Sequence, residues 1–247
     1  MINHFNTFVL LFVLLLSSCS SESTSVSEIL TPSNSKNKIM PLGASRVAGA
    51  RPEYESYRYE LWKLLVDSGT EFDFIGTEND EANYPDFNGL SFDRNHEGRG
   101  GINSSEIRSE IDGWLSDAGA PDIVLFSSPG GNDDLTSITY EGVLENINAI
   151  IDAIQSINPN VTIIIERAAP PMTSEQTSEF LAVYNRIISD VATIAEGQST
   201  VTSKVLTVDM ATGFTDAMLA DDVHYNEAGA QFIAGRYFEI LQSILSE

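Results

Sequence analysis

The amino-acid sequence predicts an α/β domain in which a five-stranded parallel sheet is covered by helices on both faces. Short apolar segments alternate along the chain with longer helical segments, and this alternation is typical of a parallel sheet between two helical layers. The length of 247 residues suits one such domain, and the 42% of apolar residues are enough to form its core.

Each element follows from a local pattern. The expected strands are the apolar segments 38–43, 72–76, 123–126, 161–165 and 205–208. The expected helices are 54–68, 104–115, 140–157, 174–195 and a last helix that ends near Ile244. Asn226 is a favourable N-cap for this last helix, because its side chain can accept a hydrogen bond from the first turn.

The N-terminal segment has the pattern of an export signal. Residues 8–16 are apolar but too short to span a bilayer, and Leu16-Ser17-Ser18-Cys19 resembles a bacterial lipobox. We therefore expect a lipoprotein-type signal peptide (1–18) and a lipidated Cys19; an ordinary cleaved signal peptide with an incidental cysteine is the alternative. The Ser-rich residues 19–37 are expected to form a flexible tether and residues 38–247 the folded domain.

This pattern also predicts where the protein is found. It is expected to be exported and lipid-anchored at a bacterial cell-envelope membrane, or otherwise to be secreted or periplasmic. Contact with a membrane is expected only through the anchor at Cys19.

The composition excludes several classes of function. Asp and Glu number 36 against 13 Lys and Arg, which gives a formal net charge of −23. So negative a surface repels nucleic acid and anionic lipid headgroups. One Cys and three His exclude a disulfide framework and a Cys/His zinc cluster. The sequence shows no metal or cofactor motif, and none is expected.

Three loops that follow expected strands carry polar residues. They are 43–46, 128–133 and 221–224. Because the carboxyl ends of parallel strands meet at one edge of a sheet, we expect Ser45, Asn132 and the pair Asp221 and His224 to lie close together.

This combination of side chains suits nucleophilic acyl transfer. A serine hydroxyl is a weak nucleophile until an imidazole takes its proton, and the imidazole needs a carboxylate to fix its tautomer. An asparagine amide can donate a hydrogen bond to the oxyanion that develops. Taken alone, Ser45 could cap a helix and Asn132 could bond to its own backbone. Together with the aspartate–histidine pair, they fit nucleophilic acyl transfer.

Four sequence blocks resemble those of the SGNH, or GDSL, hydrolase superfamily. They are Ile39–Arg46 (IMPLGASR), His96–Gly101 (HEGRGG), Gly130–Asp133 (GGND) and Asp221–His224 (DDVH), in the order and spacing of the family. The segments SYRYELW (56–62), FDFIG (72–76) and HEG (96–98) are further similar to carbohydrate esterase family three, which includes acetylxylan esterases. The resemblance covers about Lys38 to Glu247 and implies the SGNH hydrolase fold, a flavodoxin-like three-layer sandwich.

The resemblance also implies the roles of individual residues. Ser45 matches the nucleophile, His224 the general base and Asp221 its partner. Asn132, Gly101 and the backbone N–H of Ser45 match the donors of the oxyanion hole.

Three positions leave an alternative open. Gly100 competes with Gly101, because the adjacent glycines leave the register ambiguous by one residue. Asp222 could replace Asp221 as the partner of the base, although the three-residue spacing favours Asp221. His96 is expected to have a structural role.

The sequence departs from the family pattern at two positions. Ala44 stands where the family usually has Asp, a residue expected to brace the nucleophile loop, and Tyr225 stands where a Pro often follows the His. The nucleophile, base and oxyanion donors are present, so we expect activity to be retained, in a weakened form or toward a different substrate.

The resemblance implies a serine esterase that hydrolyses short-chain acetyl esters, with an acetylated poly- or oligosaccharide as its substrate. One alternative is a lipid-directed esterase or lysophospholipase of the same superfamily. Another is a non-catalytic, glycan-binding surface lipoprotein.

The positions of three arginines suggest that the substrate is anionic. Arg46 follows the nucleophile, Arg99 lies in the second block, and Arg167 lies just after the fourth expected strand. Because guanidinium groups pair well with carboxylates, these residues could bind a polysaccharide that bears uronic acids. The alternative is that each arginine pairs with one of the abundant Asp or Glu residues.

Overall fold

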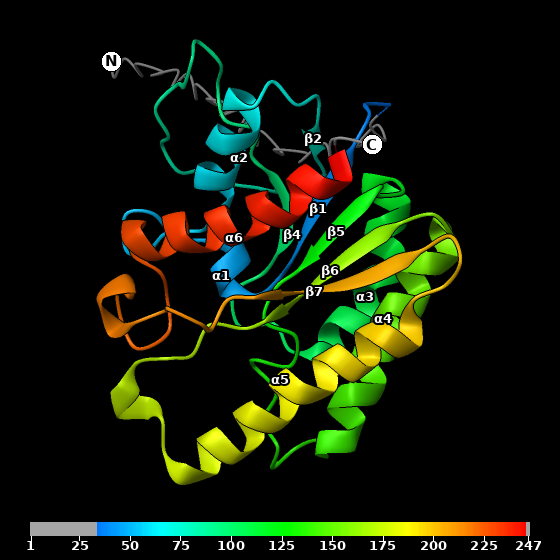
Figure 1. Cartoon of the computed structure of the whole chain (residues 1–247), viewed down its shortest axis with the longest axis vertical. Helices are drawn as coiled ribbons and strands as arrows, with labels where there is room; N and C mark the ends of the chain where they lie inside the picture. The colour runs from blue at the N-terminus through cyan, green and yellow to red at the C-terminus, as the bar shows by residue number, and fades with distance from the viewer. Residues whose placement is uncertain (1–33, 246–247) are drawn as a thin grey trace, which may run out of the picture.

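A central sheet forms the middle layer of the computed structural model, which describes residues 34–245 (Figure 1). Its strands are β1 (Lys38–Gly43), β2 (Asp73–Phe74), β3 (Glu78–Asn79), β4 (Asn95–Gly98), β5 (Ile123–Phe126), β6 (Thr162–Arg167) and β7 (Lys204–Asp209). The α-helices are α1 (Ser45–Ala48), α2 (Arg58–Asp67), α3 (Ser104–Ala118), α4 (Tyr140–Ile157), α5 (Ser178–Gln198) and α6 (Glu227–Leu245). The short 3-10 helices are η1 (Thr173–Glu175) and η2 (Asp216–Met218).

Strand β1 lies inside the sheet, whose order is β3-β4-β1-β5-β6-β7. On one edge of β1, β2 pairs with Lys38 and Ile39, and β4 pairs with Leu42 and Gly43. Strand β5 pairs along the other edge. The strands β2 and β4 therefore share one strand position beside β1, and the five expected strands lie in the order β2-β1-β5-β6-β7.

The prediction of five parallel strands is wrong in number. Within residues 34–245 the sheet has seven strands, and β3 runs antiparallel to β4. The two additional strands are only two and four residues long and consist mostly of polar residues. Strands so short and polar leave no apolar pattern in the sequence. The three-layer α/β class itself is confirmed.

The predicted helices are confirmed, with corrections at two N-termini. Helix α2 begins at Arg58 rather than at residue 54, because the preceding residues Tyr54 and Glu55 form bridges with Ala50 and Tyr225. Helix α5 begins at Ser178, after the separate turn η1. Asn226 caps α6 as predicted: its Oδ1 accepts a hydrogen bond from the N–H of Gly229.

Successive strand residues pack into opposite helical layers, as expected of a sheet buried on both faces. Ile39, Leu125 and Ile164 belong to the cluster that also includes residues of α2 and α6. Their sequence neighbours Met40 and Val124 belong to the other cluster, which is formed with α3, α4 and α5. Figure 1 shows the same division, with α2 and α6 on one side of the sheet and α3, α4 and α5 on the other.

The N-terminal predictions lie largely outside the described residues. Cys19, the expected signal peptide and most of the expected tether precede residue 34. Lipidation and export stay predictions. Among residues 34–245, no helix has the length and apolar character that crossing a membrane requires.

Candidate active site

Ser45 is the first residue of α1, and only Ala44 separates it from the end of β1. Two glycines permit the close packing around this turn. A Cβ on Gly43 would lie 2.9 Å from the carbonyl oxygen of Ser127, and a Cβ on Gly98 would lie 2.6 Å from the backbone nitrogen of Ala48. The absence of side chains at both positions lets α1 sit against the ends of β4 and β5, which places Ser45 at the carboxyl edge of the sheet.

The structure brings Ser45, His224 and Asp221 into one hydrogen-bonded chain. Nε2 of His224 lies 2.9 Å from Oγ of Ser45, and Nδ1 of His224 lies 2.7 Å from Oδ2 of Asp221. Ser45 and His224 are 179 residues apart in the sequence, so only the fold brings them together. The alternative partner Asp222 makes no hydrogen bond with its carboxylate to His224 among the described contacts.

Asp221 is held as a carboxylate. Its Oδ1 accepts hydrogen bonds from the backbone N–H groups of Val223 (2.9 Å) and His224 (2.7 Å). Partial burial alone raises the pKa of this group, but these bonds and the contact with the His224 ring outweigh burial and lower the pKa to about 2. Asp221 is therefore ionised at neutral pH, as a partner of a histidine base must be.

The face of the His224 ring is covered by Tyr54, which the sequence analysis did not identify. The ring centres lie 3.8 Å apart, and the ring planes are within 13° of parallel. The stacked phenol limits rotation of the imidazole. The only signal in the sequence was an aromatic residue at the start of the expected helix 54–68, which is too common to indicate this contact.

The predicted oxyanion donors lie on neighbouring loops. Nδ2 of Asn132 donates to the carbonyl oxygen of Ile102 (3.0 Å), the residue that follows the second block. Within the described part of the chain, the backbone N–H groups of Ser45 and Gly101 donate to no protein acceptor. The same holds for Gly100, so both glycines remain candidates.

Neighbouring side chains hold the Asn132 loop in place. The carboxylate of Asp133 accepts hydrogen bonds from Oγ (2.8 Å) and the backbone N–H (3.2 Å) of Ser104, at the start of α3. Glu166, at the end of β6, accepts from Oγ of Ser127 and from the N–H of Ser128, both at 2.8 Å. Burial of Glu166 raises its pKa, although these hydrogen bonds oppose the shift.

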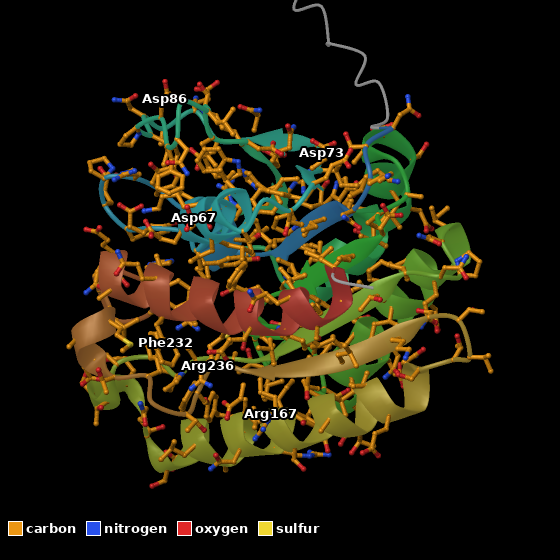
Figure 2. The ribbon with its side chains drawn as sticks, turned by 45° about the horizontal axis from the view of Figure 1, so that its top comes forward. Asp67, Asp73, Asp86, Arg167, Phe232 and Arg236 are labelled. Carbon is orange, nitrogen blue, oxygen red and sulfur yellow. The ribbon has the colours of Figure 1, made fainter. Side chains whose placement is uncertain are left out.

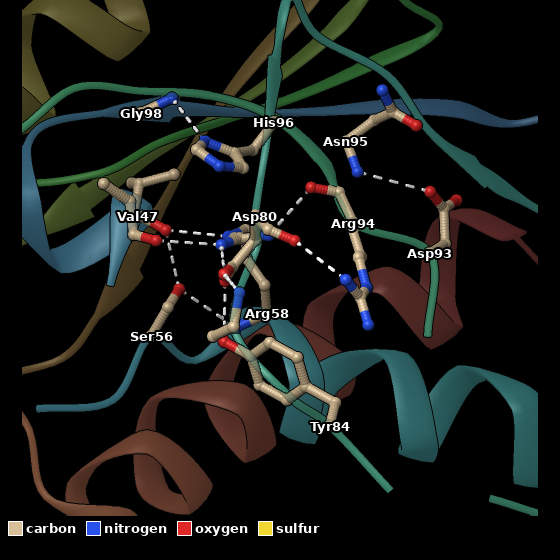
Figure 3. Close-up of polar contacts among 12 residues, drawn as sticks. Val47, Ser56, Arg58, Asp80, Tyr84, Asp93, Arg94, Asn95, His96 and Gly98 are labelled. Carbon is tan, nitrogen blue, oxygen red and sulfur yellow. Dashed lines mark hydrogen bonds and ion pairs between the residues drawn. The ribbon is translucent and has the colours of Figure 1, made fainter. Parts of the chain in front are cut away.

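A buried arginine supports the far end of α1 (Figure 3). Arg58 has no exposed surface, and it donates to the carbonyl oxygens of Val47 (2.7 Å) and Ala48 (2.9 Å). Its charge is balanced by Asp80, whose Oδ2 lies 2.8 Å away. A positive charge at the last carbonyls of a helix is favourable. Arg58 therefore fixes the short helix that carries Ser45, and it belongs to the SYRYELW segment that the sequence analysis noted without a role.

His96 is a buried residue of β4, 4% exposed. Its Nδ1 accepts a hydrogen bond from the N–H of Gly98 (3.0 Å), within the second block. Burial, reinforced by the nearby charge of Arg58, lowers the pKa of His96 to about 3. This neutral imidazole supports the loop rather than taking part in the hydrogen-bonded chain.

Two of the three arginines that suggested an anionic substrate have partners for their side chains within the protein. Arg46 bonds to backbone carbonyls of other loops. Arg99 pairs with Glu97 and Glu78. Arg167 lies opposite Asp209 in the backbone register of β6 and β7, and its charge contributes to lowering the pKa of that carboxyl. Figure 2 shows Arg167 beside β7 and α5.

Of the two interpretations, pairing with Asp or Glu describes Arg99. A role in binding an anionic substrate stays a prediction for all three arginines.

Among residues 34–245, no group of three or more His, Cys, Asp and Glu side chains is placed to hold a metal ion.

Comparison of the chain with known proteins identifies its family. The sequence model of the GDSL-like lipase/acylhydrolase family matches residues 67–232, which is more than half of the chain. This match begins after Ser45, so Ser45 is a candidate nucleophile on the evidence of the structure and the first sequence block. A comparison with curated proteins gives no significant match.

Solved structures are similar over nearly their whole length. A carbohydrate esterase family 3 protein from Talaromyces cellulolyticus has 29% identity and a TM-score of 0.72, covering 85% of this chain and 98% of its own. A mutant acetyl esterase, solved with an acetate ion, has 28% identity and a TM-score of 0.71, with coverage of 85% and 98%. A family 3 carbohydrate esterase from Clostridium thermocellum has 29% identity and a TM-score of 0.66, with coverage of 84% and 98%.

The fold, the hydrogen-bonded Ser45–His224–Asp221 chain and the family match agree with one another. The chain belongs to the GDSL-like lipase/acylhydrolase family and is a carboxylic ester hydrolase of the SGNH type.

Proposed function

We propose that this protein is an acetyl esterase that removes O-acetyl groups from carbohydrate, with Ser45, His224 and Asp221 as its catalytic residues. The observation that carries the catalytic assignment is the continuous hydrogen-bonded chain from Oγ of Ser45 through the His224 ring to Asp221. The substrate class is supported by the similarity to an acetyl esterase and to two family 3 carbohydrate esterases.

In the first half of the reaction, Oγ of Ser45 attacks the carbonyl carbon of the acetyl group while Nε2 of His224 takes the hydroxyl proton. Asp221 stabilises the imidazolium that forms. The oxyanion accepts hydrogen bonds from the backbone N–H of Ser45, the N–H of a second-block glycine and the amide of Asn132. His224 then donates its proton to the leaving sugar oxygen, which leaves an acetyl-serine.

In the second half, a water molecule takes the position of the leaving alcohol. Nε2 of His224 removes a proton from the water as its oxygen attacks the acetyl carbon, and the same oxyanion donors stabilise the second tetrahedral intermediate. Collapse of this intermediate breaks the bond to Oγ, and His224 returns the proton to Ser45. The products are acetate and the deacetylated sugar.

Two assays test the proposal. The first compares chromogenic acetyl, butyryl and octanoyl esters, and we expect kcat/KM to fall steeply beyond the short acyl groups. The second measures acetate released from a panel of acetylated polysaccharides, both neutral and uronic-acid-bearing. Preference for long acyl chains would identify a lipid-directed esterase instead. Turnover no greater than that of Ser45→Ala on every ester would indicate a binding protein.

Removal of the Asn132 amide is expected to lower kcat for a chromogenic acetate by about a hundredfold or more, the usual effect of one oxyanion donor. The change is Asn132→Ala, and KM is expected to change much less, because the oxyanion exists only along the reaction path. Asn160→Ala, in an exposed turn at the opposite end of the sheet, is the control. An unchanged kcat in Asn132→Ala would remove Asn132 from the oxyanion hole.

The increase of activity with pH is expected to follow the loss of a proton from the general base. Asp221, with a pKa of about 2, stays ionised at any higher working pH, and His96, with a pKa of about 3, stays neutral there. A protonated His224 cannot accept the serine proton. We therefore expect kcat/KM for a neutral acetate ester to rise with pH and then to level off.

The control for this profile is Asp93→Asn. Burial raises the pKa of Asp93 to about 6, so Asp93 changes charge within the pH range of the assay. Its carboxylate accepts hydrogen bonds from the backbone N–H groups of Phe74 and Asn95 rather than from any catalytic residue. The acid side of the profile is expected to be the same in this variant. A flat profile in the wild-type protein would contradict a histidine base.

A further inference from the structure

Arg46, the residue after the nucleophile, joins α1 to two other loops of the site. Its Nε donates to the carbonyl oxygen of Val223 (2.8 Å), and its Nη1 donates to the carbonyl oxygen of Ala169 (2.7 Å). Val223 lies in the loop of the base, and Ala169 lies in the loop after β6. One side chain thus fixes three segments that are far apart in the sequence.

The Arg46 guanidinium also rests on a rigid surface. It lies 4.8 Å from the centre of the Tyr225 ring, a distance typical of a cation–π contact. Tyr225 is fully buried, its ring packs edge-on against Phe214, and its carbonyl oxygen accepts a hydrogen bond from the N–H of Glu55. The Tyr225 ring that the Arg46 guanidinium contacts is therefore held in place.

The bond to Val223 acts on the turn that positions His224. In this turn, Oδ1 of Asp221 accepts from the N–H groups of Val223 and His224, so the peptide unit held by Arg46 is part of the same short loop. Because Arg46 is also adjacent to Ser45, its side chain spans the gap between the nucleophile and the base. Loss of this link would let the 2.9 Å contact between Ser45 and His224 lengthen.

We propose that Arg46 is a positioning residue, which holds the loop of His224 at hydrogen-bonding distance from Ser45. It supplies the bracing that Ala44 cannot provide, because Ala44 has no polar group where the family usually has Asp. The ring of Tyr225, at the second position that departs from the family pattern, supports it. This inference rests on the proposed catalytic roles of Ser45 and His224.

The proposal differs from the earlier hypothesis that Arg46 binds an anionic substrate. A substrate-binding arginine affects KM, acts on charged substrates only and weakens with salt. A positioning arginine affects kcat, because a misplacement of about 1 Å can cost about a hundredfold in rate. Its effect is the same on neutral and charged substrates.

The experiment measures kcat and KM of Arg46→Ala and Arg46→Lys on a neutral chromogenic acetate, at low and high salt. We expect kcat of Arg46→Ala to fall about ten- to a hundredfold, with KM within about twofold of the wild-type value at either salt concentration. Arg46→Lys is expected to lose kcat as well, because an ammonium group cannot reach both carbonyl oxygens as the planar guanidinium does.

Arg236→Ala is the matched control. Arg236 likewise donates to one backbone carbonyl, that of Thr212 (2.8 Å), and its guanidinium lies 5.1 Å from the Phe232 ring centre, but it lies on α6 and has no contact with the base. Its kcat is expected to be close to wild type. Figure 2 shows Arg236 and Phe232 on the same helix.

Thermal unfolding of each variant separates a local from a global effect. If Arg46→Ala does not fold, Arg46→Lys decides. Wild-type kcat in a folded Arg46 variant, or a loss confined to KM on anionic esters, would overturn the inference. If Ser45→Ala is inactive while Arg46→Ala has the wild-type kcat, only the positioning role fails; if Ser45→Ala is active, the proposed function itself fails.

Discussion

Ser45→Ala is expected to lower kcat on a chromogenic acetate by at least about a thousandfold while the protein stays folded. Alanine removes the only oxygen that Nε2 of His224 contacts in the described structure, and with it the acetyl-serine intermediate. Ser45 is at the surface edge of the sheet and its Oγ supports no other described contact, so the free energy of unfolding is expected to change little. Steady-state kinetics and thermal unfolding measure the two effects.

Mass spectrometry provides an independent check on Ser45. A phosphonate ester that reacts with activated serine is expected to label Ser45 in the wild-type protein and not in Ser45→Ala. Ser174→Ala, an exposed serine of η1, serves as the control and is expected to keep full activity. Near wild-type turnover in Ser45→Ala would show that the nucleophile is another residue.

Asp221→Asn is expected to lower kcat on the order of 10⁴-fold, and His224→Ala to have an effect similar to that of Ser45→Ala. An asparagine at position 221 keeps an oxygen for the N–H groups of Val223 and His224, but it no longer provides the charge that stabilises the imidazolium. The residues act as one unit, so the Ser45→Ala and His224→Ala changes together are expected to cost little more than either alone.

Asp222→Asn is the control for this prediction. The substitution removes a neighbouring carboxylate of the same loop. Among the described contacts, only the backbone carbonyl of Asp222 forms a hydrogen bond, as the acceptor for the N–H of Met172 (2.7 Å). Its kcat is expected to be close to wild type. A large loss in Asp222→Asn together with a small loss in Asp221→Asn would reverse the assignment of the histidine partner.

The sequence predicted the fold wherever an element buries a row of apolar side chains. Strand β5 and helix α4 have the predicted bounds, because both are stabilised by burial of residues that are close together in the sequence. Strands β3 and β4 were missed, since they consist mostly of polar residues whose pairing depends on the distant strand β1. The early start predicted for α2 failed for a similar reason: Glu55 pairs with Tyr225, a partner 170 residues away.

The candidate site was likewise predictable where it depends on local motifs and strand direction. The motifs placed Ser45, Asn132, Asp221 and His224 on loops at one edge of the sheet, because strand direction alone decides which loops meet there. Local spacing also favoured Asp221 over Asp222, since the chain must turn back for a carboxylate to reach Nδ1 of the histidine.

The sequence by itself therefore determined the α/β class, the family and the residues that can do the chemistry, because these depend on local apolar patterns and short motifs. The tertiary structure alone decided how those residues are held. Tyr54 stacks on the His224 ring, Arg58 supports α1, and Arg46 bonds to backbone carbonyls rather than standing free for a substrate. Each of these contacts joins residues through packing of distant segments, and any exposed aromatic or arginine in a sequence could make many other contacts, so no local pattern distinguishes them.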